Sequence, residues 1–274
     1  MQKNKFFILG LPRSGTTAVA NTLNSYDNVH MHSTKKVEGI IDNESHLFEP
    51  FALANTKVML DWKPKLINNI EPNFNQDYNG FKVIFGDQVS IHRLVNEFNY
   101  RPLVVIRKNI WKMIFSKIAA MWAVAEEDDS DNKVKTYTKS SRLANANFSY
   151  FPLFVPRFEF FLNQFIKIIY ELENEIMGTC NPISIIYFED FVKPNATNDK
   201  LNEYFGQDII FNLNYDDSFD IIDEYLSEAK WSNNQYKYLS SRIDATIEKF
   251  NIKIDPTVPD WLKEVLINHP FVDK

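Results

Sequence analysis

Short apolar runs alternate with helical patterns along most of this chain. The runs, rich in β-branched and aromatic residues, lie at 6–9, 81–85, 103–106 and 183–188. Runs of this length and apolarity are typical of strands buried on both faces. Helical periodicity is found at 14–23, 89–98, 110–125 and 158–176. Strands that alternate with helices predict an α/β fold, with a central, mostly parallel sheet and helices on both faces.

The remaining segments set the expected organisation. Residues 30–77 have weak periodicity, and we expect a long excursion with short helices, a kind of segment that often carries the substrate side of a site. Residues 126–141, EEDDSDNKVKTYTKSS, are charged and rich in serine, which predicts a solvated loop. Beyond residue 216 only helical patterns occur, so we expect a helical C-terminal part. Without an internal repeat or a linker, we predict a single domain over 1–274.

The composition of the chain excludes several classes of protein and of binding partner. With 45% hydrophobic and 24% charged residues the chain has a globular composition, and a net charge of -6 argues against a general nucleic-acid binder. The single cysteine, Cys180, excludes an internal disulfide framework and a cysteine-rich metal site. There is no 18-residue apolar run and no long apolar N-terminal segment. We therefore expect a cytoplasmic protein with no transmembrane segment and no nucleic-acid partner.

The string FFILGLPRSGTTAV, residues 6–19, is the first candidate for chemistry. A strand running into Gly10 and then a helix would present backbone N–H groups and the positive end of the helix dipole to an anion. The expected ligand-binding residues of this loop are Arg13, Ser14, Gly15, Thr16 and Thr17. The nucleotide-hydrolysing loop, G-x-x-x-x-G-K-[ST], has a lysine where this chain has Thr16. The plain alternative is a strand-to-helix turn with Ser14 as the N-cap.

A second strand also ends in basic residues, in PLVVIRKNIWKMIFSKIAA at 102–120. Arg107 and Lys108 end the strand, and Asn109 is placed to cap the next helix. Ser116 follows Asn109 by two turns and shares its face. This pattern predicts a second anion cradle; the alternatives are a solvated strand end and a core serine bonded to the Lys112 carbonyl.

Together the two strings resemble those of sulfotransferases that use 3'-phosphoadenylyl sulfate (PAPS). The run PRSGTT resembles their loop for the 5'-phosphosulfate, and Ser116 with a basic strand end resembles their 3'-phosphate motif. The usual spacing of eight residues before Ser116 reaches Lys108, whereas nine residues reach Arg107, and both stay open. GFKVIFGDQ (80–88) resembles the strand that precedes the family's 3'-phosphate unit, and the segment 183–206 resembles its late strand together with the helix that follows. The resemblance implies a P-loop-like sulfotransferase fold.

The resemblance also implies roles for particular residues. PAPS would be the donor and adenosine 3',5'-bisphosphate the product, with no metal. The acceptor would be a hydroxyl or amine of a small molecule or carbohydrate, such as a saccharide or glycolipid. Arg13 would act in catalysis by stabilising the leaving 5'-phosphate. Phe188 would lie beside the adenine and Trp231 would close over the nucleotide; core packing is the alternative for Phe188.

The acceptor's proton needs a base, which family members supply as a histidine or glutamate. The candidates in this chain are His32, Glu38, Asp87 and His92. His32 comes first because the ordinary pKa of histidine, near 6.5, suits proton transfer at neutral pH.

Two other functions stay open. A P-loop kinase or another nucleotide phosphotransferase could carry a degenerate Walker loop. A non-catalytic protein could keep the same fold for nucleotide binding alone. The sequence predicts neither the acceptor's identity nor the oligomeric state.

Overall fold

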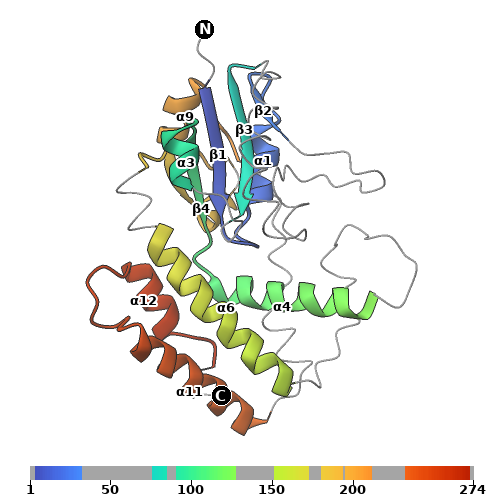
Figure 1. Ribbon diagram of the computed structural model, residues 1–274, viewed down its shortest axis with the longest axis vertical. Coiled ribbons are helices and arrows are strands. Elements are labelled where there is room, and N and C mark those ends of the chain that lie inside the picture. Colours follow the sequence, from blue (N-terminus) through green and yellow to red (C-terminus); the bar gives the residue numbers. More distant parts are fainter. Residues whose placement is uncertain are drawn as a thin grey trace. The chain divides into compact units, whose positions relative to one another are not determined.

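The computed structural model describes residues 4–32, 76–84, 91–127, 151–172, 180–193, 195–211 and 232–271. The chain divides into two compact units (Figure 1). Met1–Arg107 and Glu175–Tyr215 form the first unit, and Lys108–Asn174 and Asp216–Lys274 form the second. Each unit is thus assembled from two separate pieces of chain. The expectation of one domain over 1–274 stays a prediction.

A five-stranded sheet forms the centre of the first unit, and all its pairings are parallel. Its order is β2-β3-β1-β4-β5, so that β1 lies between β3 and β4. The strands are β1 (Asn4–Gly10), β2 (Val29–Met31), β3 (Tyr78–Ile84), β4 (Arg101–Ile106) and β5 (Ser184–Tyr187). The α/β class and the parallel sheet predicted from the sequence are confirmed.

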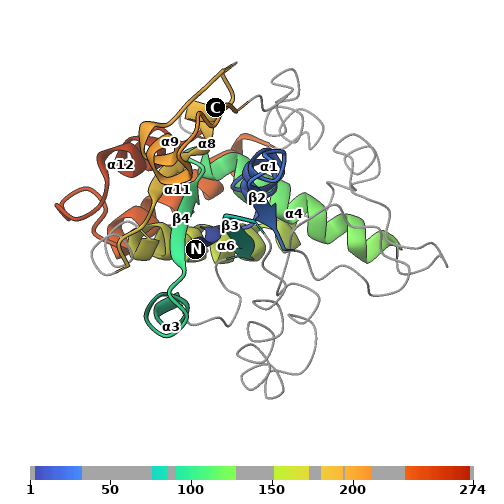
Figure 2. The same cartoon turned by 90° about the horizontal axis from the view of Figure 1, so that it is seen from above.

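Helices cover this sheet on both sides. They are α1 (Thr16–Leu23), α3 (Ile91–Asn96), α8 (Phe188–Phe191) and α9 (Asp199–Phe205). Figure 2 shows α3 on the opposite side of the sheet from α1 and α9. Because side chains alternate along a strand, Phe6 and Ile8 join the core cluster that includes residues of α1 and α9. Phe7 faces the other way and stacks on Phe81, with ring centroids 6.2 Å apart.

Strand β2 is an element that the hydrophobic pattern did not predict. It has three residues, with the half-buried His30 between two buried neighbours. A strand this short shows too little alternation to stand out. Pairing with β3, in which His30 lies opposite Asn79, defines it. The rest of the predicted excursion, residues 33–75, lies outside the described residues.

Two element boundaries also differ from the expectation. The fourth predicted strand, 183–188, ends at Tyr187, and Phe188 instead begins α8. The helix predicted at 158–176 is α6 (Phe151–Glu171), which begins earlier despite Pro152 and Pro156. Pro152 lies in the first turn, where a helix N–H has no intrahelical acceptor, so proline is tolerated there.

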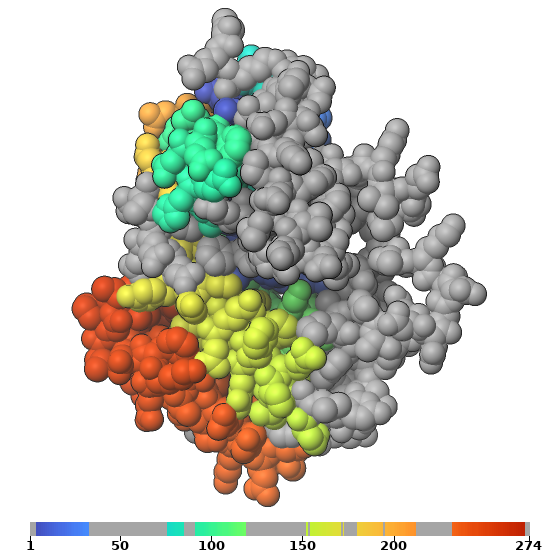
Figure 3. Space-filling view, in the orientation of Figure 1, coloured from blue at the N-terminus to red at the C-terminus, as the bar shows by residue number. Residues whose placement is uncertain are grey.

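The described part of the second unit contains helices and no strand. It contains α4 (Ile110–Glu127), α6, α11 (Asn233–Lys249) and α12 (Asp260–Ile267). Trp111 of α4 stacks on Phe158 of α6, and its indole N–H donates to the Val265 carbonyl at 3.2 Å. Figure 3 shows the adjoining surfaces of α6 and α11. No helix in the described ranges is both long and apolar enough to cross a bilayer.

Candidate anion site

The loop after β1 lies beside the end of β4, and the connections that follow these two neighbouring strands lead to opposite edges of the sheet. Gly10 at the end of β1 pairs with Val105 of β4. After β1 the chain returns to the sheet at β2, whereas after β4 it returns at β5, on the other side. Ligand sites of open parallel sheets lie at such switch points, outside the carboxyl ends of the strands. The Arg13–Thr17 loop and Arg107 both follow these strand ends.

The backbone of the loop turns through two left-handed residues. Arg13 has a φ of 70° and Gly15 a φ of 93°. The N–H of Ser14 donates to the Leu11 carbonyl at 3.1 Å. Gly15, not Ser14, is the N-cap of α1, and no side chain makes the capping hydrogen bond. Ser14 therefore does not have the role that the plain strand-to-helix turn would assign to it.

Ser14 turns its hydroxyl into the protein instead. Its side chain is fully buried, and among the described residues its Oγ has no hydrogen-bond partner. A Cβ at Gly10 would lie only 2.6 Å from this Oγ and from the Cγ2 of Thr16. The loop is thus folded closely over Gly10, with an unsatisfied donor inside it. Buried hydroxyls are rarely left without a partner, which makes this atom a candidate contact for a ligand.

Lys82 brings a positive charge to the same loop from β3. It is 1% exposed, and its Nζ donates to the Oγ1 of Thr17 at 2.7 Å. Thr17 therefore accepts from Lys82 and keeps its own O–H proton for another acceptor. Lys82 was not among the ligand-binding residues predicted from the sequence. The sequence did contain an indication of its role. Lys82 lies within the apolar run GFKVI, and a lysine in a buried strand usually has a specific polar partner.

Arg107 and Phe188 also meet the loop. The Nη1 of Arg107 donates to the Arg13 carbonyl at 3.3 Å. The guanidinium lies over the Phe188 ring, 5.2 Å from its centroid. Phe188 in turn lies against Gly15, where an added Cβ would be 2.1 Å from its Cδ2. The ends of β1, β4 and β5 thus bring together a loop, a cation and an aromatic ring.

The other half of the predicted 3'-phosphate motif belongs to the second unit. Asn109 caps α4 as predicted, since its Oδ1 accepts the Lys112 N–H at 3.0 Å. Lys108 and Ser116 are both half-buried in that unit. Their part in binding a phosphate stays a prediction.

His32 follows β2, far from the end of β1. The backbone N–H of His32 donates to the Gly80 carbonyl, and this pairing places His32 opposite Phe81 of β3. Strand spacing and rise put its Cα roughly 14 Å from that of Gly10. Burial and, to a smaller extent, the nearby His30 lower the pKa of His32 to about 4, although the hydrogen bond to Asn79 opposes the shift. The structure thus does not bring His32 to the loop, and its imidazole is a weak proton acceptor.

Three predicted residues, Glu38, Asp87 and Trp231, lie outside the described residues. Exposed His92 lies on α3. Within the part of the chain that the structure describes, no three histidine, cysteine or acidic side chains are grouped to hold a metal ion.

These features define an α/β protein with a parallel sheet and a basic, glycine-containing loop at its switch point. The sequence matches no protein-family model and no curated protein. The resemblance to sulfotransferases therefore rests on the sequence motifs alone.

Proposed function

We propose that this protein is a PAPS-dependent sulfotransferase with a P-loop-like fold. The observation that carries the proposal is the buried Oγ of Ser14, which has no hydrogen-bond partner among the described residues. It lies in a loop that leads directly into the N-terminus of α1, where the helix dipole favours an anion. A phosphate oxygen would satisfy this donor.

The residues around the loop fit such an anion. Arg13 is exposed, and its planar guanidinium can hold two oxygens at once. Thr17, bonded to Lys82, can donate its hydroxyl proton to a phosphate oxygen. Bound PAPS would supply a sulfuryl group for transfer to an acceptor hydroxyl, for which a saccharide or glycolipid is our first expectation. The chain's own contribution would be to orient the reactants and to stabilise negative charge.

Calorimetric titration with adenosine 3',5'-bisphosphate tests the proposal. We expect saturable binding without added metal, and a folded sample that gives none at high micromolar ligand would contradict it. Preference for magnesium-bound ATP would indicate a nucleotide phosphotransferase. Binding without sulfate transfer to any of a broad panel of acceptors would indicate a non-catalytic protein.

Arg13→Ala tests the chemistry of the loop. We expect it to lower the transfer rate more than the affinity for the bisphosphate, because Arg13 would stabilise charge that develops during transfer. Arg93→Ala is the matched control, since Arg93 is exposed on α3 and forms an i,i+4 ion pair with Glu97. Equal losses in the two variants would contradict this role for Arg13.

A further inference from the structure

The left-handed residues of the loop, Arg13 and Gly15, are both held from neighbouring strands. A non-glycine residue at φ 70° is strained and persists only where its surroundings hold it. Arg107, directly after β4, donates to the carbonyl of Arg13, the strained residue itself. Phe188, directly after β5, covers Gly15 so closely that no side chain fits between them.

Arg107 and Phe188 also hold each other. The guanidinium lies 5.2 Å from the ring centroid, within the range of a cation–π interaction. The ring is 6% exposed, so both its edge and its face are occupied by protein. A chain of contacts therefore runs from Arg13 through Arg107 and Phe188 to Gly15.

We propose that Arg107 and Phe188 are positioning residues, which hold the Arg13–Gly15 turn in its anion-binding conformation. This inference rests on the proposed function and deepens it. It assigns Arg107 to the 5'-phosphate loop, so that of the two basic residues only Lys108 stays a candidate for the 3'-phosphate. It also gives Phe188 a role that does not depend on the adenine.

The test compares two nucleotides that differ only in the 3'-phosphate, adenosine 3',5'-bisphosphate and adenosine 5'-monophosphate. Arg107→Lys keeps the charge but loses the planar fork. We expect it to weaken both ligands by the same factor, about tenfold, the loss of one charge-assisted hydrogen bond. Lys108→Ala should weaken the bisphosphate alone. If Arg107→Lys weakens only the bisphosphate, Arg107 contacts the 3'-phosphate and the proposal is wrong.

Phe188 is tested with inorganic pyrophosphate, which has no base to stack. Phe188→Leu should weaken pyrophosphate and the bisphosphate alike, and Phe188→Tyr, which keeps the ring, should restore both. A loss confined to adenine-containing ligands would show stacking on the base and overturn the positioning role.

Folding and the proposed function are checked separately. Unfolding curves identify variants that fail to fold, and Arg107→Gln and Phe188→Met then replace them. If the unaltered protein binds neither nucleotide, the proposed function itself fails. If it binds both and these variants bind equally well, only the positioning role fails.

Discussion

Gly15 meets two requirements that no other residue type meets together. Its φ of 93° is unfavourable for any side chain, and the Phe188 ring occupies the space of a Cβ. Gly15→Ala should therefore lower the free energy of unfolding by roughly 2–4 kcal/mol. Urea unfolding measures it. Gly206→Ala is the control, because Gly206 has a φ of 64° but a Cβ there would meet only the Tyr78 hydroxyl, at 3.8 Å. Equal losses would mean that Phe188 does not restrict position 15.

Lys82 and Thr17 should act as a pair in ligand binding. Lys82→Met and Thr17→Val each remove one side of the 2.7 Å hydrogen bond. We expect each to weaken the bisphosphate, with a coupling energy of about 0.5–3 kcal/mol in the double variant. Calorimetric titration measures all four proteins. Lys200→Met, at an exposed position on α9, is the control. Strictly additive losses would show that Lys82 does not act through Thr17.

His32 should make stability depend on pH. Burial holds its folded-state pKa at about 4, below the ordinary value of 6.5, so the unfolded chain binds more protons between these values. The contribution is present above pH 6.5 and is lost as the pH falls towards 4. His32→Gln should flatten this fall in the urea midpoint. Burial also lowers the pKa of His269, so His269→Gln should flatten it too.

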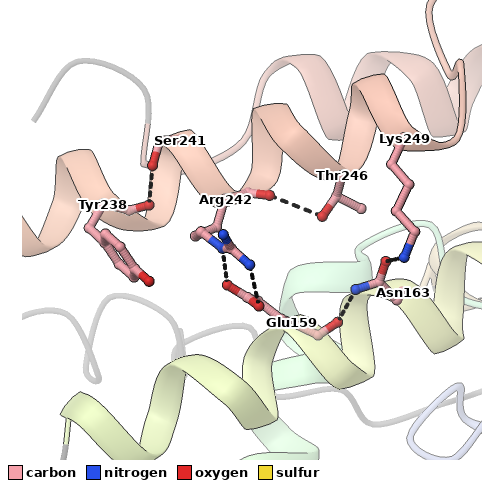
Figure 4. A network of polar contacts seen from close by, with 7 residues as sticks. All are labelled: Glu159, Asn163, Tyr238, Ser241, Arg242, Thr246 and Lys249. Carbon is pink, nitrogen blue, oxygen red and sulfur yellow. Dashed lines mark hydrogen bonds and ion pairs between the residues drawn. The ribbon is translucent and has the colours of Figure 1, made fainter.

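At the scale of elements, α11 combines a partly exposed ion pair to α6 with buried apolar side chains of its own. Figure 4 shows Arg242 of α11 bonded to Glu159 of α6, with Nη2 and Oε2 2.9 Å apart. Both side chains are partly exposed, and such pairs contribute about 1 kcal/mol or less. Leu239 and Ile243 on the same helix are fully buried.

Removing the apolar contact and removing the ion pair should lower the free energy of unfolding by different amounts. Leu239→Ala should lower the free energy of unfolding by about 2–5 kcal/mol, because it leaves a cavity. Arg242→Met should lower it by about 1 kcal/mol or less. Urea denaturation compares them, and a larger loss for Arg242→Met would show that the ion pair dominates.

The elements also show where sequence patterns were sufficient. Strands β1 and β4 are long and apolar, so their runs of apolar residues were enough to predict them from the sequence. The N-cap of α4 was predicted because Asn109 acts on the backbone three residues away. Strand β2 depends on pairing with β3, which lies about fifty residues further along the chain. A local hydrophobic pattern cannot reveal such a long-range pairing.

At the scale of the whole molecule, the two segments of each compact unit are connected through a segment that belongs to the other unit. The first unit is interrupted after Arg107, and the second after Asn174. Unfolding one unit would leave a long open loop in the other, at an entropic cost. We therefore expect one thermal transition with equal calorimetric and van 't Hoff enthalpies, as a single domain requires. Two resolved transitions in scanning calorimetry would contradict the single-domain prediction.

The sequence alone determined the α/β class and the loop from Arg13 to Thr17, because burial patterns and glycine positions act over a few residues. It also marked Arg107 and Phe188, but with ligand roles taken from a resemblance. Only the tertiary structure placed Arg107 on the Arg13 carbonyl, Phe188 on Gly15 and Lys82 on Thr17. These contacts join strand ends that are far apart in the chain, and the order of the strands in the sheet decides which of them meet.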